Sequence, residues 1–566
     1  MNLLSLRQAA ATCTALLLLS VASAQEMGGD KVDLAVLAQI KTEAFQNSKV
    51  MENLFYMSEV YGPRVTNSGN HRAAAEWAMK QMKEWGLQNV HLEKFPFGYG
   101  WQIKKFYGAM ESPAYAAFTG FPLAWTPSTN GPLTADPIFA PIHSKDDFAK
   151  YHGKLKGKIV LMFDPPTLTL HMRADAQPSP TDEEILARGG ARGGEGGGRG
   201  AAAAGGAGAP SNPATDRDPS GRGRPGEGTW TYTPTSLALA NAKNHDLRNE
   251  VNAYMKAEGA AMILTPGYNG DGGTIFSTYG GSEDPKDPVP PPMAAINPEQ
   301  YNRIVRLLQH NITPKLTFDI QVDYQKEDQN AFNVIGEIPG TTKKDEVVML
   351  GGHFDSWQGG TGATDNGTGS AVAMEAVRIL ATLKKPMART VRVALWGGEE
   401  EGVYGSTAYV QQRFAPRTTM VKTPEYDKLD VYFNDDGGSG RFRGVSAGGS
   451  PQMAAIFKSW IEPIKDQHIV AVSGGDQFRP TASPGGTDSS AFSWIGLNGI
   501  GFQQDGLEYG TRTHHSNADT YDRVQKADVM QSSMIEAWFA YNAATRAELL
   551  PRIPTPAPDP NAKSHE

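Results

Sequence analysis

Residues 346–405 read EVVMLGGHFDSWQGGTGATDNGTGSAVAMEAVRILATLKKPMARTVRVALWGGEEEGVYG, and this stretch decides the fold. Two apolar runs, residues 346–350 and 390–396, have the length and β-branched content of buried parallel strands. Between these runs, apolar residues recur at helical spacing over residues 368–383, after a glycine-rich turn. The stretch therefore predicts a strand–helix–strand unit of an α/β protein.

Polar side chains follow the ends of these predicted strands. His353 and Asp355 come after the first strand, Asp365 comes before the helix, and Glu399 and Glu400 come after the second strand. In an open α/β sheet, ligands bind beyond the carboxyl ends of the strands. An imidazole together with several carboxylates suits zinc. The sequence thus predicts a metal site at this edge of the sheet.

Length and composition limit the class of protein. A chain of 566 residues exceeds one ordinary hydrophobic core, so two domains are expected. The formal charge of −8 makes nucleic-acid binding a poor interpretation. The single cysteine is Cys13, so the chain after residue 24 has no thiol, and core packing and metal must stabilise it.

The first 24 residues have the pattern of a secretory signal peptide. They contain one arginine, then an apolar run, and they end in Ala22-Ser23-Ala24. A membrane anchor is the alternative, but the apolar core is short for a bilayer span. We therefore expect cleavage near Gln25, a secreted or periplasmic protein, and no stable membrane anchor after cleavage.

Composition along the chain predicts the domain boundaries. We expect a catalytic domain in two parts, residues 25–131 and 315–550, separated by an insert of residues 132–314. Within the insert, residues 189–228 are dominated by glycine, alanine, arginine and proline, and we expect them to be disordered. The proline-rich, charged tail, residues 551–566, is also expected to be disordered.

Two further motifs come later in the chain. Together with the residues named above, they resemble the motifs of metallopeptidase family 28. The motifs are His353-x-Asp355, Asp365, Glu399-Glu400, Asn434-x-Asp436 and His515-Ser516-x-x-Asp519-Thr520. This family includes zinc aminopeptidases, glutamate carboxypeptidases and the plasma glutamate carboxypeptidase, to which the contexts around Trp396 and His514 are most similar. The resemblance covers both catalytic parts, and the insert is similar to a protease-associated domain.

The resemblance implies a fold and a ligand set. The fold would be a mixed, mostly parallel sheet flanked by helices, with a smaller β-rich insert. Two zinc ions would share Asp365, and the remaining ligands would be His353, Asp436, Glu400 and His515. Manganese or cobalt would tolerate the same ligands.

The resemblance also implies catalytic roles. Glu399 would be the general base that activates the water, and Asp355 would orient His353. The peptide bond between Asp365 and Asn366 would be cis.

Neighbouring residues compete for some of these roles. Asp435 competes with Asp436, and His514 competes with His515, and the motif spacing favours the second residue of each pair. The third acidic residue of its run, Glu401, is expected to be solvated. Tyr509, Arg512 and His514 flank the metal motifs and are candidates for binding the substrate, whereas Asp488 is interpreted as part of a structural loop.

The predicted function is that of a metallo-exopeptidase acting on peptides, as an aminopeptidase or dipeptidase. A carboxypeptidase that recognises an anionic terminal residue is the alternative, with Arg512 as the obvious cation. A non-catalytic binding ectodomain on the same fold is the alternative from another class, although such proteins lose metal ligands. A homodimer is compatible with the sequence, which does not decide the oligomeric state.

Overall fold

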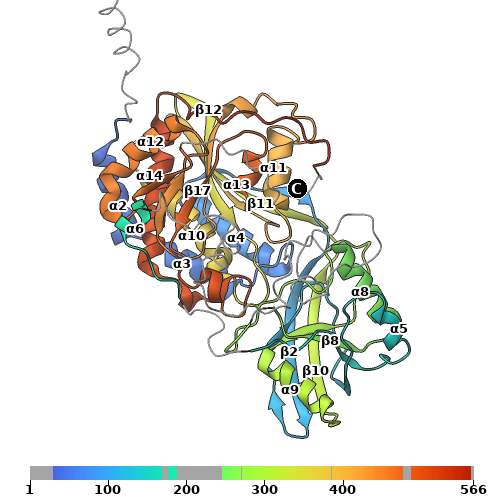
Figure 1. The fold of residues 1–566 in the computed structure, drawn as a ribbon. Coiled ribbons are helices and arrows are strands. Elements are labelled where there is room, and N and C mark those ends of the chain that lie inside the picture. Colours follow the sequence, from blue (N-terminus) through green and yellow to red (C-terminus); the bar gives the residue numbers. More distant parts are fainter. Residues whose placement is uncertain are drawn as a thin grey trace, which may run out of the picture.

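A computed structural model describes residues 30–168, 176–187, 245–268, 270–383, 385–475 and 486–562. The chain forms a large lobe around an eight-stranded sheet and a smaller lobe around two further sheets (Figure 1). The predicted signal peptide, residues 1–24, and the predicted disordered segment, residues 189–228, lie outside the described residues.

The sheet of the large lobe is mixed, as predicted. Its central strands β13, β12, β14 and β17 are parallel neighbours, whereas β1 and β11 on one side and β15 on the other pair antiparallel. The last strand, β16, is parallel to β15. In spatial order the strands are β1 (Gln88–Pro96), β11 (Asn330–Ile338), β13 (Arg389–Trp396), β12 (Lys343–His353), β14 (Leu429–Asn434), β17 (Gly499–Gln504), β15 (Phe442–Ser446) and β16 (Ala471–Ser473).

Helices cover both faces of this sheet because its strands are apolar on both sides. Successive side chains alternate between faces: Val348 and Leu350 of β12 belong to one buried cluster, and Met349 belongs to another. The helices on the first face are α2 (Leu34–Gln46), α3 (Val50–Phe55), α4 (Gly69–Glu84), α10 (Thr368–Thr382), α12 (Pro451–Ile461) and α14 (Lys526–Thr545). The second face carries α11 (Tyr404–Arg413) and α13 (Ser489–Ser493).

The smaller lobe has a five-stranded and a four-stranded sheet that share one hydrophobic core. The first contains β4 (Gly120–Pro122), β9 (Met293–Ile296), β8 (Met262–Thr265), β7 (Ile159–Leu161) and β6 (Pro137–Phe139). The second contains β3 (Ala116–Ala117), β2 (Gly100–Ser112), β10 (Lys315–Gln325) and β5 (Leu133–Ala135). Its helices are α5 (Asp147–Tyr151), α8 (His245–Ala257) and α9 (Pro298–Gln309) (Figure 1).

The predicted boundaries of the insert, residues 132 and 314, differ from this arrangement. Strand β2 pairs with β10 along nearly its whole length, so the smaller lobe extends from about residue 100 to residue 325. One segment inside those bounds instead lies on the large lobe (Figure 1): Asp182 of α6 (Asp182–Ala187) accepts a hydrogen bond from Arg443 at 2.6 Å. Both differences arise from pairings between residues distant in sequence.

The predicted disordered tail is anchored over part of its length. The guanidinium of Arg552 donates to the carbonyl of Leu429 at 2.6 Å, and Asp559 pairs with Arg417 at 3.0 Å. These side chains hold residues 551–562 against the large lobe, and the prediction of disorder remains only for residues 563–566, which lie outside the described residues. Among the described helices, none is both long and apolar enough to span a bilayer.

Candidate metal centre

The predicted ligands lie at one edge of the large sheet. His353 is the last residue of β12, Glu399 and Glu400 follow β13, and Asp436 follows β14. Because these three strands are parallel neighbours, their carboxyl ends meet at the same edge. Asp365 lies on a π turn (Ala363–Gly367) between β12 and α10.

Five side chains converge at this edge. The Nε2 atom of His353 lies 3.3 Å from Oδ1 of Asp436 and 3.4 Å from Oδ1 of Asp365. The other oxygen of Asp365 lies 3.4 Å from Nε2 of His515, which in turn lies 2.9 Å from Oε2 of Glu400. Asp365 therefore stands between two ligand groups, which matches the bridging position that the family resemblance implies.

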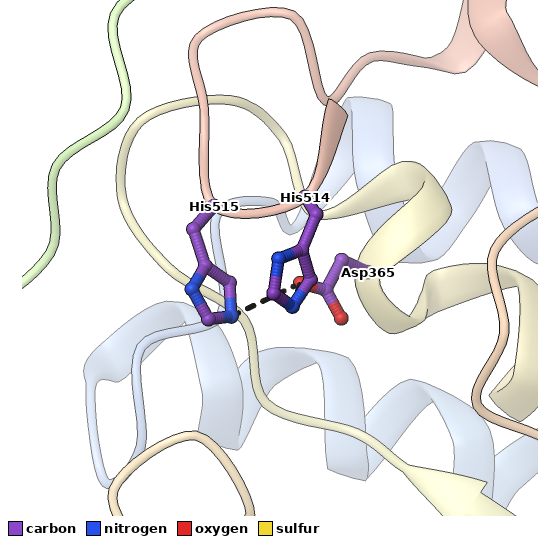
Figure 2. Close-up of side chains that lie close together, drawn as sticks. All are labelled: Asp365, His514 and His515. Atoms are coloured by element: carbon purple, nitrogen blue, oxygen red, sulfur yellow. Dashed lines mark ion pairs between the residues drawn. The ribbon is translucent and has the colours of Figure 1, made fainter. Parts of the chain in front are cut away.

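His514 and His515 both lie beside Asp365, and Figure 2 shows their rings next to each other. His514 is the more distant of the two, with Nε2 3.9 Å from Oδ2 of Asp365. His515 also reaches Glu400, so the geometry favours it as the ligand.

The geometry also favours Asp436 over Asp435. Asp436 belongs to a cluster with His353 and Glu399 whose ligand atoms lie within 4.8 Å of one another. Asp435 belongs to none of the clusters formed by the described residues, and its carbonyl accepts a hydrogen bond from the amide of Asn366. The peptide bond between Asp365 and Asn366 is cis, as predicted.

The donor set fits divalent cations. Oδ2 of Asp365 and Oε1 of Glu400 are buried and have no hydrogen-bond partner among the described residues. A buried carboxylate oxygen without a partner is costly in free energy, and a cation between the carboxylates would remove that cost. Imidazole nitrogens and carboxylate oxygens are ligands that zinc accepts.

Asp355 links the ligand His353 to the loop that carries the two glutamates. The Oδ1 atom of Asp355 lies 3.6 Å from Nδ1 of His353, and its carbonyl oxygen lies 3.1 Å from the same nitrogen. The backbone N–H groups of Glu399 and Glu400 donate to its carboxylate at 3.3 and 3.1 Å. Asp355 is fully buried, and its contacts connect the loop after β12 with the loop after β13.

The prediction that Glu401 is solvated is wrong. Glu401 is buried, and its Oε2 atom lies 2.7 Å from the hydroxyl of Thr66, which also lies 3.1 Å from Oδ2 of Asp355. Thr66 comes from the loop before α4, and that loop covers the glutamates. Sequence reasoning missed Thr66 because nothing in its local pattern marks it as part of a site.

Glu399 and Asp488 are two carboxyl groups beside the predicted ligands, and the charge of Asp488 acts on Glu399. Burial raises the pKa of Glu399 well above its ordinary value; His353 opposes this shift, and Asp436 and Asp488 add to it. Burial likewise raises the pKa of Asp488 to about 8, against the opposing charge of His353. Asp488 is buried, although its sequence pattern favoured a plain structural loop. A carboxylate whose pKa is raised holds a transferred proton more readily.

Two of the predicted substrate-binding residues are engaged within the protein. The hydroxyl of Tyr509 donates to Oδ1 of Asp365 at 3.1 Å, which places Tyr509 beside the ligands. The guanidinium of Arg512 is hydrogen-bonded to Asp271 of the smaller lobe. His514 stacks on His515 and is partly exposed.

Residues 333–538 match the model of a family described as peptidase family M28. This part of the chain is similar to peptidase family M28. The residues matched by this model include every predicted ligand and the predicted base, and they omit the smaller lobe.

Known proteins similar to this chain include a carboxypeptidase and an aminopeptidase by name. Carboxypeptidase Q of Homo sapiens is 27% identical over 281 residues, which cover 49% of this chain and 55% of that protein. The probable leucine aminopeptidase 2 of Aspergillus oryzae is 29% identical over 254 residues, covering 43% of this chain and 46% of the relative. The matched segments thus span about half the length of these curated relatives.

Solved structures share the fold over most of the chain. The peptidase M28 precursor of Shewanella amazonensis superposes with a TM-score of 0.59 at 21% identity, over 92% of this chain and 99% of that chain. A zinc aminopeptidase of Bacillus subtilis superposes with a TM-score of 0.51 at 16% identity, over 91% and 96% of the two chains. These likenesses confirm the α/β fold predicted from the sequence.

Proposed function

We propose that this chain is an exopeptidase with two zinc ions, in which Glu399 is the general base. The observation that carries the proposal is the convergence of four other ligand side chains around Asp365, with Glu399 beside them. His353 and Asp436 would hold one zinc ion, Glu400 and His515 the other, and Asp365 both. Zinc bound there would supply Lewis acidity that polarises a peptide carbonyl and acidifies water.

The protein side chains then carry the proton and orient the groups. Glu399 takes a proton from the attacking water and delivers it to the leaving amine. Asp355 holds the imidazole of His353 and, through two backbone N–H groups, the loop that carries Glu399. Because one residue contacts the ligand through its carbonyl and the loop of the base through its carboxylate, the spacing of ligand and base is set before substrate arrives.

The charge around the centre supports cleavage near a free amino terminus. Carboxylates dominate the site, and Arg512, the cation singled out for binding a substrate carboxylate, is held by Asp271. Because Arg512 is engaged by Asp271, that cation is not free to pair with the terminal carboxylate of a substrate. We therefore favour an aminopeptidase or dipeptidase over a carboxypeptidase for anionic terminal residues. Export to the periplasm or the medium remains part of the proposal.

Glu399→Gln tests the base, with the exposed Glu425→Gln as the matched control. The proposal expects Glu399→Gln to keep the zinc content of the wild type and to lower kcat by about 10²–10⁴-fold, the contribution typical of a general base. Normal turnover in this variant would refute the assignment. Hydrolysis of aminoacyl anilides but not of N-blocked dipeptides supports the aminopeptidase, and the reverse preference supports the carboxypeptidase.

A further inference from the structure

The loop that carries His515 lies against a segment of the smaller lobe. Phe276 forms an antiparallel bridge with Ser516, and the backbone N–H of Ser277 donates to the carbonyl of His515 at 3.3 Å. The same loop is tied at its start, where Arg512 is hydrogen-bonded to Asp271. A candidate zinc ligand therefore has direct backbone contact with a lobe that lies outside the residues matched by the M28 model.

Asn517 makes the densest set of these contacts. Its backbone N–H donates to the carbonyl of Ile275 at 3.2 Å, and its side-chain Oδ1 accepts from the backbone N–H of Ile275 at 2.7 Å. Its side-chain Nδ2 donates to the carbonyl of Gly273 at 3.1 Å. Through these three hydrogen bonds, a single residue two positions after His515 connects the ligand loop to residues 273–275.

His515 itself needs such support. Its φ of +61° lies in the left-handed region, which is unfavourable for a residue with a Cβ atom. The carbonyl of His515 accepts from Ser277, and the hydroxyl of Ser516 accepts from the backbone N–H of Ala518 at 3.0 Å. A strained backbone conformation persists only where neighbouring contacts hold it, and here part of that support comes from the other lobe.

We propose that Asn517 is a positioning residue that makes residues 273–277 of the smaller lobe a structural part of the metal centre. Its side chain holds the ligand loop in the conformation that directs Nε2 of His515 toward Glu400 and Asp365. The zinc ion on the His515 side therefore depends on contact between the lobes, whereas the ion on the His353 side does not. This inference rests on the proposed zinc centre.

Asn517→Ala removes both side-chain hydrogen bonds and leaves the ligands unchanged. Asn302→Ala is the matched control, because Asn302 donates a comparable bond to the carbonyl of Pro166 within the smaller lobe, at 2.8 Å. Zinc affinity is measured on the full chain by competition with a chromophoric chelator, alongside kcat, KM and the thermal midpoint. Asn517→Ala should weaken one of the two zinc ions by about 10–100-fold, as for other residues that support metal ligands.

Excess zinc should restore kcat in Asn517→Ala, and Asn302→Ala should bind both ions with wild-type affinity. Wild-type affinity for both ions in Asn517→Ala would overturn the inference, as would equal weakening of both ions. If Asn517→Ala does not fold, Asp271→Asn is measured instead, and it should weaken the same ion about threefold or more. Two bound zinc ions without peptidase activity in the wild type would refute the proposed function alone, because zinc affinity still tests Asn517.

Discussion

The hydroxyl of Thr66 stands between two carboxyl groups: it lies 2.7 Å from Oε2 of Glu401 and 3.1 Å from Oδ2 of Asp355. A hydroxyl has one proton to donate, and ionised carboxylates only accept, so one of the two carboxyl groups must hold a proton. Burial, with the charge of Asp355 next, raises the pKa of Glu401 well above its ordinary value. We predict that Glu401 is the carboxyl group that holds this proton, which would let it donate to the hydroxyl of Thr66 while Thr66 donates to Asp355.

Thr66→Val is expected to lower kcat by roughly 10-fold, because loss of a hydrogen bond to Asp355 loosens both His353 and the loop that carries Glu399. Thr66→Ser keeps the hydroxyl and should remain near wild type. Steady-state kinetics on an aminoacyl anilide measure both variants. Equal losses in Thr66→Val and Thr66→Ser would indicate that packing of the methyl group, and not the hydrogen bond, is what matters.

Glu401→Gln should retain most of the activity, because an amide N–H donates to Thr66 as a neutral carboxylic acid does. Glu401→Ala removes the partner that orients the hydroxyl of Thr66 toward Asp355 and should lose activity to about the extent of Thr66→Val. The ratio of kcat values for the two variants is the measurement. A glutamine variant as impaired as the alanine variant would contradict a protonated Glu401.

His515→Ala should reduce the bound zinc to about one ion per chain, whereas His514→Ala should keep both. The reason is that only His515 reaches both Glu400 and Asp365 within 3.4 Å. Metal content after dialysis against a weak chelator distinguishes them. If His514→Ala loses one zinc ion and His515→Ala retains both, then His514 and not His515 is the ligand.

Asp430→Asn should flatten the pH dependence of stability below neutrality. Burial raises the pKa of Asp430 to about 6, although hydrogen bonding from Leu550 and the charge of Arg389 oppose the shift. The unfolded chain loses this proton near the ordinary pKa of about 4, so stability is complete below that pH and falls as pH rises toward 6, by up to about 3 kcal/mol.

Urea denaturation at several pH values between those limits gives the free energy of unfolding for wild type and Asp430→Asn. The exposed Asp427→Asn should keep the wild-type slope, since only a buried carboxyl gains the shift. An unchanged slope in Asp430→Asn would assign the pH dependence to other groups.

Local pattern was sufficient for the strand–helix–strand unit and for the ligands at its ends. Apolar runs over residues 346–350 and 390–396 correspond to β12 and β13, and the helix predicted between them is α10. Since parallel neighbours end at one edge, His353 and Glu400 could be placed together from the sequence alone. The resemblance to family 28 added Asp436, His515 and the order of the motifs.

Contacts between distant segments could not be read from these patterns. An acidic run such as residues 399–401 looks solvent-exposed, and only the loop that brings Thr66 over it buries Glu401. Pairing of β2 with β10 widens the smaller lobe beyond its compositional boundaries. The partners of Arg512 and Asn517 lie more than two hundred residues away, at Asp271 and Ile275.

Chain periodicity and motif spacing thus account for the α/β class, the metal-ligand residue types and their place at the strand ends, because these depend on neighbours within a few residues. Only the tertiary structure determines that Glu401 is buried, that Arg512 pairs with Asp271 and that the smaller lobe supports His515. These contacts depend on which surfaces of the two lobes pack together after folding, and a local stretch of sequence does not contain that information.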